Sequence, residues 1–276
     1  EADRYLGRLR QFPMELHAQH LRPIQAGIRI RRYEILMRAA GLPEAASAPK
    51  ELIAGAEVLG LGAVLDRRVV GELLVWLAQR SEVWANEPAQ FSINLTSGAL
   101  SDANFLQFVR LCLEKAQLPR GLVAFEAQHE FCARTPVYFA QLAAQLEQAG
   151  AGVVIDDFVL SETGIDLLLQ PGVRLVKLAA GLTRDLVNDR GRQARVAAIA
   201  QAARVAGVHV VAKNVECPAS QALLQALGVD FMQGYGTSAP APLDTVEARM
   251  AELRIIDPQF GEEDAVDAEP RFAATG

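Results

Sequence analysis

Residues 152–158 read Gly-Val-Val-Ile-Asp-Asp-Phe, so an uninterrupted apolar run leads directly into two adjacent carboxylates. A run of this kind is typical of a β-strand that is buried on both faces, as in a parallel sheet. Asp156 and Asp157 then lie at the C-terminal end of that strand. Because neighbouring carboxylates repel each other, the pair predicts a cation or donors nearby, and its oxygens suit Mg²⁺. The alternative is an ordinary strand end, with Asp157 capping the helix that follows.

Strands and helices alternate on both sides of this segment. Helical periodicity and end signals recur, as in the helix that Pro136 begins and Gly150 ends. With about eight strands in ~250 residues, the pattern predicts a (β/α)₈ TIM barrel rather than an open doubly wound sheet. No Gly-x-Gly-x-x-Gly follows a strand, which argues against a dinucleotide-binding Rossmann fold. The other expected strands are 16–25, 28–36, 91–95, 122–126, 174–178, 208–212 and 229–232.

Composition narrows the class of protein. The chain has 276 residues, 51% of them hydrophobic, and a net charge of −6, which argues against a nucleic-acid partner. Cys112, Cys132 and Cys217 are far apart and show no disulfide or zinc spacing, so we expect a reducing, cytoplasmic compartment. No signal peptide is visible, and no apolar run approaches the ~18 residues of a membrane span.

The chain divides into three expected segments. Residues 1–15 carry the spacing of an amphipathic N-terminal linker helix, residues 16–256 form the barrel domain, and residues 257–276 form a flexible acidic tail. Because the first residue is Glu1 rather than methionine, we expect an upstream domain in a longer chain.

Polar side chains recur where the predicted strands end. In a TIM barrel these ends meet at one mouth, where such enzymes carry out chemistry. Carboxylates, an amide and a lysine at one mouth suit Mg²⁺ or Mn²⁺ acting on a phosphodiester. Each residue also has a structural explanation: Asn94 as a turn cap, Glu126 paired with Arg120, and Lys177 extending its amine toward solvent. The set is Glu34, Asn94, Glu126, Asp156, Asp157, Lys177 and Gln233.

These residues belong to longer motifs, and over roughly residues 14–250 the chain resembles the EAL domains that bind or hydrolyse cyclic di-GMP. Glu34-Ile35-Leu36 stands where the family has its signature Glu-Ala-Leu, and Asp156-Asp157-Phe158 matches the paired aspartates. The other matching positions are Leu16-His17-Ala18-Gln19, Tyr33, Arg38, Ser92-Ile93-Asn94-Leu95-Thr96, Glu126, Lys177, Gln233-Gly234-Tyr235 and Pro240.

The resemblance implies a modified TIM barrel with one antiparallel strand, often dimeric, and a role for each match. Lys177 and Gln233 would hold catalytic water or a metal-bound water, and Arg38 would contact a nucleotide phosphate. The implied metal ligands are Glu34, Asn94, Glu126, Asp156 and Asp157. The implied nucleotide-binding residues are Gln19, Glu34, Leu36, Arg38, Asn94, Asp157, Glu216 and Pro240. We expect Lys213, which has no counterpart in the family pattern, to join them as a cation that faces a phosphate in place of a metal.

The departures from the family pattern are equally informative. Active members carry Ala-Glu-Gly-Val-Glu where this chain has Ala-Lys-Asn-Val-Glu over residues 212–216, so Lys213 replaces a ligand glutamate. At ~4 Å and an effective dielectric constant near 20, each unit of that charge change is worth about 4 kcal/mol. The loop over residues 159–163 lacks the family's glycines, Ala179 replaces an aspartate, and His129 replaces a second glutamate.

Three functions follow as hypotheses. The leading one is a degenerate EAL domain that binds cyclic di-GMP as a receptor, with Mg²⁺ or Mn²⁺ bound weakly or not at all and Lys177 and Gln233 vestigial as catalysts. The second is an active Mg²⁺- or Mn²⁺-dependent phosphodiesterase that yields linear pGpG. The third is a scaffold that binds a protein partner, another copy or a different protein, and no nucleotide.

Overall fold

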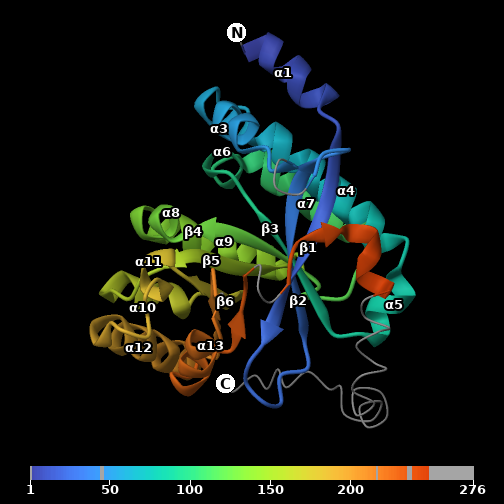
Figure 1. The fold of residues 1–276 in the computed structure, drawn as a ribbon. Coiled ribbons are helices and arrows are strands. Elements are labelled where there is room, and N and C mark those ends of the chain that lie inside the picture. Colours follow the sequence, from blue (N-terminus) through green and yellow to red (C-terminus); the bar gives the residue numbers. More distant parts are fainter. Residues whose placement is uncertain (1, 44–46, 216, 235–237, 249–276) are drawn as a thin grey trace.

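A nine-stranded sheet closed into a barrel forms the centre of the computed structural model, which describes residues 2–43, 47–215, 217–234 and 238–248. Strand β1 closes it by pairing antiparallel with both β2 and β8, whereas β2 to β8 run parallel in sequence order (Figure 1). The strands are β1 Met14–Pro23, β2 Arg31–Ala39, β3 Ala89–Asn94, β4 Val123–Gln128, β5 Gly152–Phe158, β6 Val173–Leu178, β7 His209–Ala212, β8 Phe231–Met232 and β9 Ala241–Pro242. The expected TIM barrel with one antiparallel strand is therefore confirmed.

Helices surround the barrel. They are α1 Ala2–Gln11, α3 Lys50–Val58, α4 Gly62–Ala78, α5 Ser81–Asn86, α6 Ser97–Leu100, α7 Ala103–Ala116, α8 His129–Arg134, α9 Pro136–Gln148, α10 Glu162–Leu168, α11 Ala180–Thr183, α12 Arg190–Ala206 and α13 Pro218–Ala226, with a 3₁₀ turn η1 at Leu243–Thr245. In the part of the chain that the structure describes, no helix combines the length and the apolar character needed to cross a membrane.

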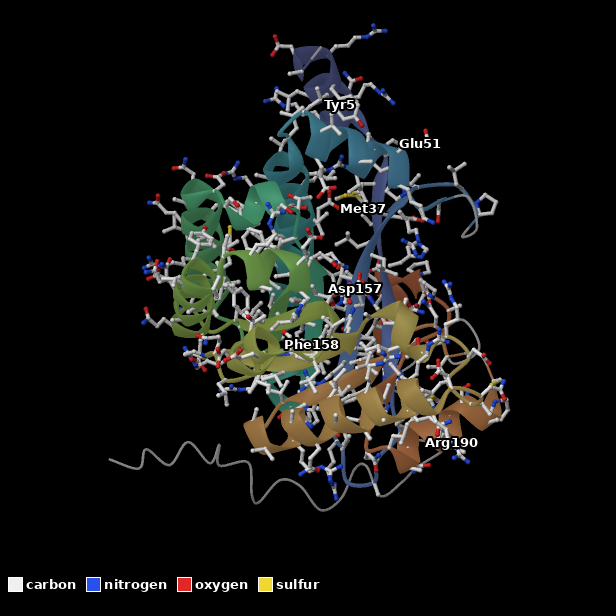
Figure 2. All side chains as sticks on the ribbon, turned by 90° about the vertical axis from the view of Figure 1, so that its left-hand side faces the viewer. Tyr5, Met37, Glu51, Asp157, Phe158 and Arg190 are labelled. Atoms are coloured by element: carbon white, nitrogen blue, oxygen red, sulfur yellow. The ribbon has the colours of Figure 1, made fainter. Side chains whose placement is uncertain are left out.

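The N-terminal segment contains the expected helix. Helix α1 packs through Leu9, which is buried, and through Tyr5, whose hydroxyl donates to Leu52 O of α3 at 2.9 Å (Figure 2). Its role as a linker stays a prediction. Glu216, Tyr235 and the tail over 257–276 lie outside the described residues.

Strand alternation separates the core from the site. On β2, Tyr33, Ile35 and Met37 belong to the main apolar core between barrel and helices. Successive side chains of a strand point to opposite faces, so Glu34 and Leu36 point into the barrel.

Inside the barrel, six buried side chains form an apolar layer beneath the mouth. They are Leu21, Ala124, Val154, Leu175, Val211 and Phe231. Two positions from each of them toward the mouth, on the same strand or directly after its end, stands a polar residue. These residues are Gln19, Glu126, Asp156, Lys177, Lys213 and Gln233. The period of two along a strand therefore places all six polar side chains on the barrel's inner face, between the apolar layer and the mouth.

Several boundaries differ from the sequence expectation. Strand β2 begins at Arg31 rather than residue 28, and β4 continues to Gln128, because its residues pair in register with β5 as far as Asp156. Helix α4 ends at Ala78, and α5 follows it as a separate short helix. The short strand β9, which pairs with β1, was not predicted, since two residues carry no periodicity.

Candidate functional site

Lys177 lies at the centre of the polar side chains inside the barrel, with 1% of its side chain exposed. Its Nζ is 2.7 Å from Glu34 Oε2 and 2.7 Å from Glu126 Oε1. The alternative prediction, that Lys177 extends its amine toward solvent, is therefore wrong. Burial opposes the charged ammonium, but the carboxylates of Glu126, Glu34 and Asp156 outweigh it and raise the pKa of Lys177.

Glu34 accepts hydrogen bonds from three side chains of the site. Its Oε1 accepts from Asn94 Nδ2 at 2.6 Å, and its Oε2 accepts from Gln233 Nε2 at 2.6 Å as well as from Lys177. Gln233 Nε2 also donates to Gln19 Oε1 at 2.8 Å, across the antiparallel β1. Burial alone would raise the pKa of Glu34, yet Lys177 and these donors hold it well below its usual range. The Asn94 side chain thus joins the site rather than only capping a turn.

Glu126 is buried, and it accepts hydrogen bonds from fewer side chains than Glu34 does. Its Oε1 accepts from Ser92 Oγ and Lys177, while its Oε2 has no partner among the described residues. Burial, with the charges of Glu34 and Asp156, raises the pKa of Glu126 despite Lys177. The expected alternative partner, Arg120, instead donates to the carbonyls of Glu147 and Gln148 at the C-terminal end of α9.

At the mouth, a second lysine binds the paired aspartates. Lys213 Nζ donates to Asp156 Oδ1 and to Asp157 Oδ1, each at 2.6 Å. Burial opposes its charge, but Asp156 and then Asp157 raise the pKa of Lys213. Both Asp157 and Asn214 take left-handed φ values, +51° and +57°, a conformation that Asp and Asn adopt more readily than most residues. Lys213 therefore supplies the cation that two adjacent carboxylates require.

Asp157 does not cap the helix that follows. Ser161 takes that position and its side chain accepts from Gly164 N, because the loop over residues 159–161 separates the strand from α10. In Figure 2, Asp157 lies near the middle of the molecule, with Phe158 below it and to the left.

The predicted metal ligands come together at the mouth of the barrel. Their oxygens are of the type that Mg²⁺ prefers, and Glu126 Oε2 is free to accept. Glu34 and Asp156, however, are bonded to ammonium groups and amides rather than left open. Across residues 2–43, 47–215, 217–234 and 238–248, no group of three His, Cys, Asp or Glu side chains is arranged to hold an ion. The described side chains thus fit two lysine ammoniums better than two divalent ions.

Leu36, Arg38, Pro240 and Glu216 are the remaining predicted nucleotide-binding residues. Leu36 and Arg38 alternate with Glu34 on the inner face of β2, toward the mouth, and Arg38 is buried with Nη1 donating to Met37 O at 3.0 Å. Pro240 is buried just before β9. Glu216 falls outside the described residues.

Three polar side chains of the site were not predicted. Ser92 bonds Glu126, Gln128 Nε2 donates to Asp156 Oδ2 at 3.2 Å, and Thr183 Oγ1 donates to Lys213 O at 3.0 Å. Alternation could have found two of them, since Ser92 precedes Asn94 by two residues and Gln128 follows Glu126 by two. No sequence signal marks Thr183, which reaches Lys213 from α11.

Comparison with known proteins gives consistent matches. The family model described as "EAL domain" matches residues 14–240. The chain is 26% identical over 241 residues to the cyclic di-GMP phosphodiesterase PdeB of Shewanella oneidensis, and 31% identical over 213 residues to the cyclic di-GMP phosphodiesterase PdeF of Escherichia coli. These matches cover 86% and 76% of this chain but only 28% of each relative.

A solved structure shares the fold. The EAL domain of Pseudomonas aeruginosa FimX bound to c-di-GMP superposes with a TM-score of 0.75, covering 87% of this chain and 96% of that one at 21% identity. At this identity the likeness concerns the fold.

Proposed function

Because this chain belongs to the EAL domain family, we propose that it binds cyclic di-GMP as a receptor with little or no hydrolysis. The observation that carries the proposal is the pair of 2.6 Å contacts between Lys213 Nζ and the two aspartates. The resemblance to active members assigns those aspartates to metal binding. A lysine bonded to both competes directly with a divalent cation, so we propose that Mg²⁺ or Mn²⁺ binds weakly or not at all.

The lysine can also replace the metal as a phosphate ligand. An ammonium has three donors, and Lys213 uses two of them on Asp156 and Asp157. The third remains for a phosphate oxygen, to which lysine binds as a point charge. Its side chain is 17% exposed, so the ammonium is within reach of a ligand at the mouth. Arg38, Gln19 and Asn94 would provide further contacts to the dinucleotide.

An active phosphodiesterase is the second candidate, and one observation favours it. The hydrogen-bonded network of Lys177, Glu34, Asn94 and Gln233 is intact, and Glu126 Oε2 is available as an acceptor. When bound, a divalent ion would polarise a phosphoryl oxygen and lower the pKa of bound water. The protein's own network would then orient Glu34 and hold Lys177 charged.

A protein-binding scaffold is the third candidate. Val159, Leu160, Ile165 and Leu169 are exposed by 37–64% around α10, and such residues are typical of contact surfaces when they are contiguous. The chain spans 28% of PdeB and 28% of PdeF, and our proposal includes an upstream domain. It also includes a homodimer or another protein partner, and a location in the cytoplasm.

Calorimetric titration of cyclic di-GMP, first with Mg²⁺ and then with excess chelator, tests the proposal, combined with chromatography of the incubated nucleotide. The receptor predicts saturable binding in both buffers and no linear product. Accumulation of linear pGpG with Mg²⁺ would overturn it in favour of the enzyme. Absence of heat in both buffers would overturn it in favour of the scaffold.

A further inference from the structure

A buried carboxylate on helix α4 contacts the segment that follows strand β3. Asp66 is 5% exposed, and its Oδ2 accepts from Thr96 N at 2.8 Å and from Thr96 Oγ1 at 2.7 Å. Burial raises the pKa of Asp66 to about 6, although both donors of Thr96 oppose the shift. Because burying a carboxylate costs free energy that an apolar side chain would not, core packing does not explain an aspartate at this position.

The same face of α4 approaches Thr96 at a second position. Gly62 lies one turn before Asp66, and a Cβ atom there would overlap Thr96 Oγ1 and lie 2.8 Å from Thr96 Cβ. Glycine, which has no Cβ, allows this close approach of the two backbones. Helix α4 therefore fixes Thr96 both by its backbone and by the Asp66 carboxylate.

Thr96 belongs to the segment that carries Asn94 of the nucleotide site. Asn94 is the last residue of β3, and Thr96 follows two residues later as the N-cap of α6. Pairing of β3 with β2 ends at Ile93. Toward β4, Leu95 N still donates to Glu126 O at 3.1 Å. The contact with Asp66 thus holds the chain just past the point where one of the two neighbouring strands no longer pairs with it.

We propose that Asp66 is a positioning residue of the nucleotide site. By holding Thr96 it fixes the end of β3, and with it the Asn94 side chain, whose Nδ2 donates to Glu34 Oε1 at 2.6 Å. Asp66 acts through Thr96 and not by contact with the ligand. The inference rests on the proposed function, because Asn94 is one of the residues that would contact cyclic di-GMP.

The side-chain amide of Asn94 gives a readout that needs no nucleotide. In ¹⁵N–¹H spectra of the free protein at pH 7.5, its signals are those that disappear in Asn94→Ser. Asp66→Ala, which removes the acceptor of Thr96, should move these signals toward the position of a solvent-exposed asparagine. Asp66→Asn, which keeps an acceptor oxygen at the same place, should leave them close to their position in the parent chain.

Further variants keep the test decisive if Asp66→Ala does not fold. Thr96→Val removes the hydroxyl donor and should move the Asn94 signals, whereas Thr96→Ser retains the hydroxyl and should not. Leu73→Ala is the control for loosened packing, because Leu73 is buried on α4 two turns after Asp66, about 10 Å away. Its truncation should leave the signals in place.

Calorimetry then relates the position of Asn94 to binding. Cyclic di-GMP should bind Asp66→Ala at least tenfold more weakly than the parent chain, and Asp66→Asn should restore the affinity to within about threefold. Asn94 signals that stay in place in Asp66→Ala and Thr96→Val, or that move equally in Leu73→Ala, would overturn the positioning role, as would unchanged affinity of Asp66→Ala. A parent chain that binds no cyclic di-GMP would overturn the proposed function instead, and the amide signals would still decide whether Asp66 positions Asn94.

Discussion

Two lysines of one barrel bind carboxylate pairs in different surroundings. Lys177 is enclosed between Glu34 and Glu126, with 1% of its side chain exposed. Lys213 lies at the mouth between Asp156 and Asp157, where Asp157 is 51% exposed. The interior pair has less access to water, with 12% of the Glu34 side chain and 1% of the Glu126 side chain exposed, whereas the mouth pair can exchange partners with a ligand. The two lysines therefore differ in how easily a ligand or an ion could compete for their carboxylate partners.

The largest expected effect comes from removing the interior cation. Lys177→Met leaves Glu34 and Glu126 buried without a counter-charge, which should cost about 3–5 kcal/mol of unfolding free energy. Lys213→Met, the matched variant at the mouth, should cost about 1 kcal/mol, since water can solvate its partners. Urea denaturation measures both. Equal losses would show that the two lysines are not in different environments.

A charge reversal at the mouth should restore metal binding. Lys213→Glu removes the competing ammonium and adds a third carboxylate beside Asp156 and Asp157, so the affinity for Mn²⁺ should rise at least thirtyfold, about 2 kcal/mol. Calorimetry measures the gain, and Lys213→Gln separates loss of the lysine from gain of the ligand. If Mn²⁺ affinity does not change, the obstacle lies in the glycine-poor loop after Phe158 rather than in the charge.

The interior carboxylates should also make stability depend on pH. The pKa of Glu126 is raised by burial above its unfolded value near 4.3, so its protonated form favours folding. That contribution is present below the unfolded pKa and is lost as pH rises through the folded one, with a slope of at most about 1.4 kcal/mol per pH unit.

Glu126→Gln should therefore have a flatter stability curve than the parent chain above pH ~4.3, measured by urea denaturation. Glu82→Gln, at an exposed position of α5, is the control and should run parallel to the parent. Parallel curves for Glu126→Gln would contradict the raised pKa.

Most of the barrel could be predicted from the sequence because buried parallel strands and helices differ strongly in periodicity. The segment over 152–158 has no other reading as clear as a buried strand, and it is β5. Two-residue elements such as β9 carry no period and were missed. Glu126 was taken as a strand end, because the extension of β4 to Gln128 depends on pairing with β5.

The site was predictable where polar residues follow apolar ones on an inner face, as Lys177 follows Leu175. Which of these residues bond to one another could not be predicted from the sequence. The pairing of Glu126 with Lys177 instead of Arg120, and the contact of Thr183 with Lys213, depend on how separate strands and loops are placed in space.

The most direct test of the role of Lys213 is the affinity for cyclic di-GMP in excess chelator, measured by calorimetry for the parent chain and for Lys213→Met. If Lys213 serves as the cation of the nucleotide site, the parent binds without metal and Lys213→Met binds at least tenfold more weakly. Binding by the parent only when Mg²⁺ is supplied, or equal affinities of the two chains in chelator, would contradict it.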